Sequence, residues 1–218
     1  MSLSVLKVGG VPDVAFKDLC LDTTQPDVVG PYWRDLLGLT GVRQDGGDWA
    51  LSGTPKERAV WVNTVPEPKT AKSRVHLDIR VDDHTGPSRW EVRQDPDGLE
   101  WCAFGPGEGD GAFELVVDSA DPAAQAAWWA ARTGGTVHND GHPWHWVEGA
   151  AGFPYLYWVF QPVPEPKTVK NRMHWDVTLV DGSIAALEAA GARVLEVQPS
   201  WTVLADPEGN EFCAFPTT

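Results

Sequence analysis

The sequence predicts an α+β fold made of four βαβββ modules, and three observations support this prediction. The segment Val65–Thr70 returns as Val163–Thr168, with VPEPKT in both places. The segment Asp95–Phe104 returns as Asp206–Phe215, DPDGLEWCAF against DPEGNEFCAF. In both halves, strand-like alternation of apolar residues also precedes and follows a helix-like segment in the same order. A tandem duplication of a unit of about a hundred residues explains all three observations.

The first module begins with a strand in which Leu19 and Leu21 alternate with polar or small residues. A helix is expected from Pro26 to Leu37, ended by Gly38. Pro31 lies inside this helix and predicts a kink or a later start, because proline cannot donate the helical hydrogen bond. The glycine-rich turn at 45–47 then marks a hairpin, with strands at Trp49–Ser52 and Ala59–Val65.

The third module repeats this order. Phe113, Leu115 and Val117 alternate along a strand, and Asp121-Pro122 supplies a helix N-cap followed by proline at the first helical position. The helix is expected over Ala123–Thr133, and strands follow at Trp144–Val147 and Tyr155–Gln161.

The fourth module is complete, whereas the second is shortened. In the fourth module, the sequence pattern predicts a strand at Met173–Val180, a helix at Gly182–Ala190 and strands at 193–197, 201–205 and 210–215. His174 and Asp206 lie 32 positions apart, but the matching His76 and Asp95 lie only 19 apart, a deficit of 13. The second module therefore lacks its helix, near 83–88, and we expect one uncovered sheet face there. Two domains are expected, 11–105 and 111–218.

The composition restricts the partners. The chain has 218 residues, 42% of them hydrophobic, and a net charge of −14 with a pI near 4.7. Such a charge disfavours nucleic acid and anionic membranes, but it suits a cationic small ligand. The chain start has no basic segment followed by a long apolar run, so we expect no signal peptide. No stretch is long enough to span a membrane, and three cysteines are too few for a disulfide framework. We expect a cytoplasmic protein.

The repeated His-x-Asp strand and the Asp-Pro-x-Gly terminus resemble the glyoxalase-like branch of the glyoxalase, bleomycin-resistance-protein and extradiol-dioxygenase superfamily, also called vicinal oxygen chelate. The resemblance extends from about Val14 to Phe215. It implies two glyoxalase-like domains whose curved mixed sheets surround a cavity. It leaves the activity open, because the superfamily contains lyases, isomerases, dioxygenases, thiol transferases and proteins that only bind a drug.

Strand alternation predicts which residues face the cavity. Val75, Leu77 and Ile79 form an apolar face, so His76 and Asp78 point the other way. We expect the better pocket in the second half, because that half keeps both helices. The expected pocket residues are Glu114, Gln161, His174, Asp176, Glu211 and Cys213, with Trp144, Trp146 or Trp158 at the edge. The first half offers the equivalent residues Asp18, Asn63, His76, Asp78, Glu100 and Cys102.

Metal binding is the alternative chemistry for these residues. The resemblance implies that first strands carry metal ligands, here Glu114 and His174, with Asp18 and His76 in the other half. The last strands carry Cys102 and Cys213 where metal-dependent relatives have glutamate. Zn, Ni, Fe or Mn would therefore find a weak ligand set, and we expect no cofactor. A hydrogen-bonded polar pair of Glu114 and His174 is the competing interpretation.

Two further segments leave alternatives open. The basic residues Lys69, Lys72 and Arg74 and their copies could hold an anionic group, or they could bind acidic neighbours such as Glu67. The histidines and tryptophans of 138–146 fit either a metal site or an ordinary half-buried strand.

Three classes of function thus compete. The first is metal-free binding of an aromatic or cationic small molecule, which the tryptophans and the acidic charge favour. The others are a metal-dependent lyase, isomerase or dioxygenase, and a fold reused for protein contacts at the uncovered face near His84. The expected partner is a small molecule, and a homodimer is compatible with the sequence.

Overall fold

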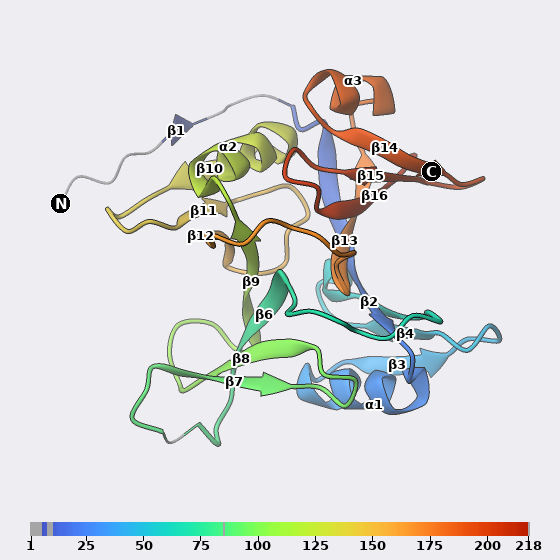
Figure 1. The fold of residues 1–218 in the computed structure, drawn as a ribbon, viewed down its shortest axis with the longest axis vertical. Coiled ribbons are helices and arrows are strands. Elements are labelled where there is room, and N and C mark those ends of the chain that lie inside the picture. Colours follow the sequence, from blue (N-terminus) through green and yellow to red (C-terminus); the bar gives the residue numbers. More distant parts are fainter. Residues whose placement is uncertain (1–5, 8–10, 85, 218) are drawn as a thin grey trace.

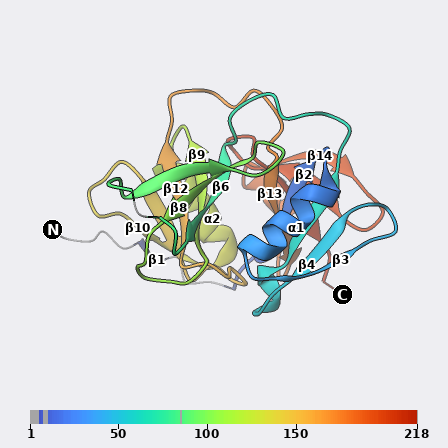
Figure 2. The ribbon, with the colours of Figure 1, turned by 90° about the horizontal axis from the view of Figure 1, so that it is seen from below.

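The computed structural model describes residues 6–7, 11–84 and 86–217 and shows two mixed β-sheets side by side (Figures 1 and 2). Sheet A, on the left in Figure 1, has the strand order β1-β10-β11-β12-β9-β6-β8-β7. Its strands are β1 (Leu6–Lys7), β6 (Val75–Arg80), β7 (Trp90–Gln94), β8 (Glu100–Phe104), β9 (Ala112–Ser119), β10 (Thr136–His138), β11 (His145–Glu148) and β12 (Tyr157–Pro162).

Sheet B lies on the right, in the order β14-β15-β16-β13-β2-β5-β4-β3. Its strands are β2 (Val14–Thr23), β3 (Thr40–Arg43), β4 (Trp49–Ser52), β5 (Val60–Thr64), β13 (Met173–Leu179), β14 (Arg193–Val197), β15 (Thr202–Ala205) and β16 (Glu211–Phe215). The helices are α1 (Pro26–Leu36), α2 (Pro122–Thr133), α3 (Ile184–Ala189) and a 3-10 turn at Lys56–Arg58. Within the described residues, no helix is long and apolar enough to cross a membrane.

The predicted fold class is confirmed, but the sheets do not follow the two halves of the sequence. Sheet A joins the second module to the third, and sheet B joins the first module to the fourth. The reason is that the first strands pair across the halves: β6 runs antiparallel to β9, and β13 runs antiparallel to β2. The halves 11–105 and 111–218 therefore describe the sequence repeat, and each half contributes strands to both sheets.

The predicted helix signals act as expected. Asp121 caps α2 by accepting a hydrogen bond from the Ala124 N–H, and Pro122 takes the first helical position. Gly134 ends this helix with φ +70°, a conformation that residues with a Cβ rarely adopt. α1 begins at Pro26 and extends through Pro31, so the later start does not occur.

The Asp-Pro-x-Gly echo joins the two modules of each half. Asp95 accepts a hydrogen bond from the indole N–H of Trp33 on α1, and Asp206 accepts one from Trp129 on α2, at 2.9 and 3.2 Å. The acid two positions later, Glu208, accepts hydrogen bonds from the first residues before α2. Each turn therefore fixes a helix of the preceding module by buried and charge-assisted hydrogen bonds.

The VPEPKT echo joins the two sheets. The two proline-containing connectors pass beside each other between the sheets, as Figure 2 shows. Arg74 donates to the carbonyl oxygen of Glu165, and Arg172 donates to that of Glu67, both at 2.7 Å. Because the contact is reciprocal, each copy of the motif holds the other.

In the shortened second module, β8 is largely buried, whereas β7 at the sheet edge is mostly exposed. Residues 82–83 form a turn and residues 86–89 form bends, while Thr85 lies outside the described residues. The indole of Trp101 on β8 is nevertheless only 2% exposed. Its N–H donates to Tyr32 of α1 at 2.9 Å, and Arg93 lies over its ring. Tyr32 of α1 and Arg93 of β7 thus cover the indole of Trp101.

Glu208→Ala should lower the free energy of unfolding by about 1–2 kcal/mol, because the helix start loses its acceptor. The carboxylate receives the Ser119 hydroxyl and the N–H groups of Ala120 and Asp121 at 2.7–3.0 Å. Urea unfolding measures the change. Glu196→Ala, at an exposed glutamate, is the control and should stay within about 0.5 kcal/mol. Equal effects would contradict this role of Glu208.

Asp206 should make the stability depend on pH. Burial raises the pKa of its carboxyl to about 6, against the hydrogen bonds from Asn210 and Trp129. Because the folded-state pKa exceeds the unfolded value near 3.9, this contribution to stability is complete below about pH 4 and is lost as the pH rises through 6. The unfolding free energy of wild type relative to Asp206→Asn should therefore fall by about 2–3 kcal/mol between pH 4 and 7. A difference independent of pH would contradict this.

Candidate functional site

A cavity of about 710 Å³ opens on the face of sheet A that is turned away from the core. Along β6, Val75, Leu77 and Ile79 are buried in the core, while His76 and Asp78 line the cavity, as the alternation predicts. The lining comes from the second and third modules and comprises Lys72, Ser73, His76, Asp78, Arg80, Arg89, Trp90, Val92, Glu100, Cys102, Phe104, Glu108, Phe113, Glu114, Val116, Asp140, His142, Trp144, Trp146, Glu148, Tyr157, Val159 and Gln161.

Aromatic side chains form much of the cavity wall. On the β7–β8 side, the rings of Trp90 and Phe104 stack with centroids 6.0 Å apart. On the β11–β12 side, Trp146 packs edge-to-face with Tyr157 at 6.3 Å, and Trp144 stacks with His142 at 4.1 Å. The two sides thus offer flat π surfaces around one space.

Two carboxyl groups lie beside each other on the floor of the cavity. The antiparallel register of β6 and β9 places Asp78 opposite Glu114. Burial, and then the charge of Asp78, raise the pKa of Glu114 to about 8. Cys102 on β8 lies opposite Asp78 on β6, and burial raises the pKa of the Cys102 thiol to about 12. The floor is therefore acidic, with a neutral thiol beside it.

Two of the cations that line the cavity, Arg80 and Lys72, already have partners. Arg80 donates to the carbonyl oxygens of Gly105 and Glu108, at 3.1 and 3.2 Å. Lys72 forms an ion pair with Asp118 at 2.7 Å. In the residues that the structure covers, no lysine or arginine nitrogen comes within 4.0 Å of the carboxylates of Asp78 or Glu114.

Sheet B carries the same arrangement on its equivalent face. Asp176 pairs with Asp18, and burial followed by the charge of Asp18 raises the pKa of Asp176 well above its usual value. His174 on β13 and Cys213 on β16 correspond to His76 on β6 and Cys102 on β8 in sheet A. Burial lowers the pKa of His174, so its neutral form is favoured.

The structure divides the pocket residues that the sequence predicts. Glu114, Gln161, Trp144 and Trp146 line the sheet A cavity. His174, Asp176, Glu211 and Cys213 lie on sheet B. The first-half residues divide likewise: His76, Asp78, Glu100 and Cys102 line the sheet A cavity, and Asp18 and Asn63 lie on sheet B. The cause is the pairing of first strands across the halves, so Glu114 meets Asp78 and not His174.

Other predicted residues have structural roles. Trp158 is fully buried in the core, stacked on Phe153 with centroids 5.0 Å apart. Glu211 accepts from Lys167 at 2.6 Å and from the Asn171 N–H at 3.1 Å, so it fixes a connector. Its counterpart Glu100 forms the same pair with Lys69.

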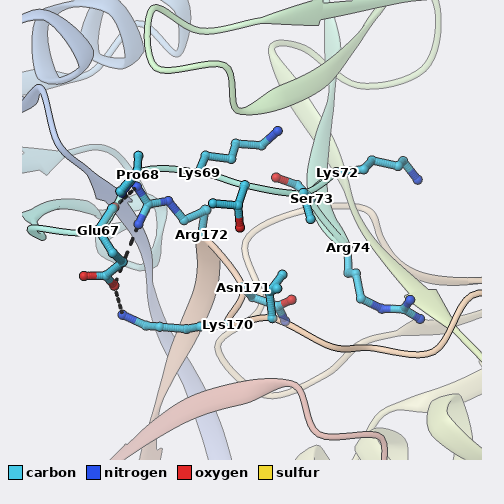
Figure 3. Close-up of a pocket in the computed structure, with 12 residues that line it drawn as sticks. Glu67, Pro68, Lys69, Lys72, Ser73, Arg74, Lys170, Asn171 and Arg172 are labelled. Atoms are coloured by element: carbon cyan, nitrogen blue, oxygen red, sulfur yellow. Dashed lines mark hydrogen bonds and ion pairs between the residues drawn. The ribbon is translucent and has the colours of Figure 1, made fainter.

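The basic residues of the connectors therefore pair with acidic neighbours in the chain, which is one of the two interpretations that the sequence leaves open. A second hollow of about 90 Å³ lies where the connectors cross, and Figure 3 shows the residues around it. In this view Lys170 and Arg172 point toward Glu67, to which dashed lines join them. Lys170 also pairs with Asp22 at 2.5 Å.

Several residues that line the cavity are not among those that the sequence predicts. Trp90, Phe104, Phe113 and Tyr157 belong to the wall, although the sequence predictions do not include them. Strand alternation could have predicted Phe104 as a cavity residue, because it lies two positions after Cys102 and therefore shares its strand face. Strand alternation could not have predicted Phe113, because this residue shares the face of Glu114 only through an irregularity in the strand pairing.

Two groups of side chains have the residue types of a metal site. Ligand atoms of His76, Asp78 and Cys102 all lie within 4.8 Å of one another, and those of Cys20, His174 and Asp176 do the same. Nitrogen, oxygen and sulfur donors suit zinc, and Asp78 Oδ1 is buried without a hydrogen-bond partner. The residues thus fit a zinc ion, provided that the thiol loses its proton.

Paired βαβββ modules around such a cavity are the architecture that the resemblance implies for a glyoxalase-like protein. The family model of the glyoxalase-like domain matches residues 18–86 and 114–215. The chain therefore belongs to the glyoxalase-like domain family, as the resemblance implies. None of the curated proteins matches it.

Solved structures agree with this assignment. Glyoxalase I from Zea mays has a TM-score of 0.65 at 13% identity, covering 98% of this chain and 93% of that chain. A provisionally assigned dioxygenase from Bacillus subtilis has a TM-score of 0.65 at 12% identity, covering 95% and 86%. The cppA protein of Streptococcus pneumoniae has a TM-score of 0.51 at 10% identity, covering 95% and 100%. At these identities the similarity establishes the fold.

Cys102 should be the first cysteine to react with iodoacetamide in the folded protein. It lines the cavity, whereas Cys20 and Cys213 are buried. The reaction should be slow at pH 8, because the thiol pKa is about 12 and the thiolate is the reactive form. Mass spectrometry of labelled peptides identifies the site, and Cys102→Ser should abolish early labelling. Labelling of Cys20 or Cys213 first would contradict the cavity geometry.

Proposed function

We propose that the sheet A cavity binds a flat aromatic small molecule that carries a positive charge, and that this binding needs no metal. The observation that supports the proposal best is the combination of aromatic walls with an acidic floor. Trp90, Trp146 and Tyr157 offer π faces, and Asp78 with Glu114 offers negative charge between them. A cation over an aromatic face is attracted by the ring quadrupole, and more strongly where water is excluded.

Size and charge are consistent with this proposal. A volume of about 710 Å³ lies in the range of small-molecule pockets. The net charge of −14 favours the approach of a cation from solution. Drug-binding members of the superfamily use the same fold without catalysis, and this chain carries cysteines where metal-dependent relatives carry glutamate.

N-methylacridinium, a planar aromatic cation, should bind to the protein and quench its tryptophan fluorescence. Neutral acridine at pH 7.5 is the matched probe without the permanent charge, and it should bind more weakly. Trp90→Ala should weaken the binding of the cation by about 2- to 30-fold, the range of one cation–π contact. Titration of the fluorescence gives both affinities.

The duplication supplies a matched control for this experiment. Trp201 stacks on Phe215 in sheet B, as Trp90 stacks on Phe104 in sheet A. Trp201→Ala removes the same contact far from the proposed pocket and should leave the affinity unchanged. Equal losses in the two variants would place the ligand elsewhere.

A metal-dependent lyase, isomerase or dioxygenase is the second candidate, and the His76, Asp78 and Cys102 group favours it. A bound zinc ion would act as a Lewis acid toward a substrate oxygen. The protein, incubated with Zn²⁺ or Ni²⁺ and then dialysed, should retain well under one equivalent by elemental analysis. Retention of one equivalent that His76→Ala abolishes would favour this second candidate.

A further inference from the structure

Each sheet contains a register shift in its strand pairing beside two opposed acidic residues, its acid pair: Asp176 and Asp18 in sheet B, and Asp78 and Glu114 in sheet A. In sheet B, Asp176 pairs with Asp18 but Val177 pairs with Phe16, so Lys17 is the extra residue. In sheet A, Asp78 pairs with Glu114 but Ile79 pairs with Ala112, so Phe113 is the extra residue. Bulges of this kind redirect a side chain relative to simple alternation. Lys17 and Phe113 therefore occupy equivalent places in the two sheets.

Lys17 places an ammonium group on the acid pair of sheet B. Its Nζ lies 2.5 Å from Asp18 Oδ2 and 3.8 Å from Asp176 Oδ2. The same nitrogen lies 4.4 Å from the ring centroid of Phe215. Sheet B therefore shows how this arrangement binds a primary ammonium: Asp18 accepts its hydrogen bond, Asp176 adds a second negative charge nearby, and an aromatic face covers it.

Sheet A has the same receptor without the ammonium. Glu114, Asp78 and Phe104 are the counterparts of Asp18, Asp176 and Phe215. Asp78 is only 6% exposed, lines the cavity, and its Oδ1 has no hydrogen-bond partner. His76 Nε2 lies 3.4 Å from that oxygen without forming a hydrogen bond.

Arg80, which lines the cavity, does not fill this place. The guanidinium of Arg80 lies 3.9 Å from the centroid of the Phe113 ring, and its hydrogen bonds go to backbone carbonyls. A buried carboxylate oxygen that faces a cavity without a donor is a position at which an external donor gains a charge-assisted hydrogen bond.

We propose that the sheet A cavity selects aromatic amines, binding the protonated amino group on Asp78 and Glu114 as sheet B binds its own Lys17. This inference rests on the proposed function and makes it more specific, because it names the chemical group on the floor of the cavity. An ammonium with N–H donors should be preferred over a quaternary cation, which has charge but no donor.

Three probes with the same phenethyl body test this selectivity by isothermal titration calorimetry. They are 2-phenylethylammonium, its N,N,N-trimethyl derivative and neutral 2-phenylethanol. The primary ammonium should bind at least about tenfold more tightly than either of the others, the effect of one hydrogen bond to a charged group. Equal or tighter binding of the trimethyl derivative would overturn the inference.

Phe113→Lys gives an independent test, because it places a lysine in sheet A where sheet B has one. Binding of 2-phenylethylammonium should be lost, since the variant would carry its own ammonium on the acid pair. Phe113→Leu, which changes the same position without charge, should retain measurable binding. Thermal unfolding confirms that both variants fold. Unchanged binding in folded Phe113→Lys would contradict the inference.

The outcomes separate this inference from the proposed function. If N-methylacridinium and all three phenethyl probes fail to bind, the proposed function is wrong and the selectivity falls with it. If N-methylacridinium binds but 2-phenylethylammonium shows no advantage over its trimethyl derivative, only the preference for amines is wrong.

Discussion

Antiparallel pairing between first strands of different halves is the constraint on which the rest of the structure depends. It places Asp78 opposite Glu114 in sheet A and Asp176 opposite Asp18 in sheet B. Like charges directly opposite each other destabilise a sheet. Burial and repulsion raise the pKa of one acid in each pair, so a proton or a cation relieves the conflict.

This pairing also explains why the two sequence echoes are structural. Each half contributes strands to both sheets, so the chain must cross between the sheets within each half. The VPEPKT connectors make these crossings and hold each other through Arg74 and Arg172. The Asp-Pro-x-Gly turns fix α1 and α2 through buried indole hydrogen bonds. The most conspicuous repeats therefore stabilise the assembly. The cavity is formed mostly by residues outside them, and the second repeat adds Glu100, Cys102 and Phe104 to its lining.

The duplication produces two similar sites that differ at one place. In sheet B the bulge residue is Lys17, which neutralises the acid pair from within the chain. In sheet A it is Phe113, which adds an aromatic surface and leaves the acids facing a cavity. The tryptophans divide in a similar way: Trp33, Trp101, Trp129, Trp158 and Trp175 fill the core, while Trp90, Trp144 and Trp146 line the cavity. In one sheet the chain's own Lys17 thus lies on the acid pair, and in the other the acid pair faces a cavity.

The sequence by itself determined the modules, the order of the elements and the faces of the strands. These depend on local signals: the cap at Asp121, the stop at Gly134 and the alternation around His76 act over a few residues. Only the tertiary structure decided which modules share a sheet, because strand pairing between distant segments has no local signal. For this reason the sequence placed Glu114 with His174, whereas the fold places it with Asp78. The covering of Trp101 by α1 and the roles of Lys17 and Phe113 were decided at the same level, since they depend on long-range packing and on a bulge in the register.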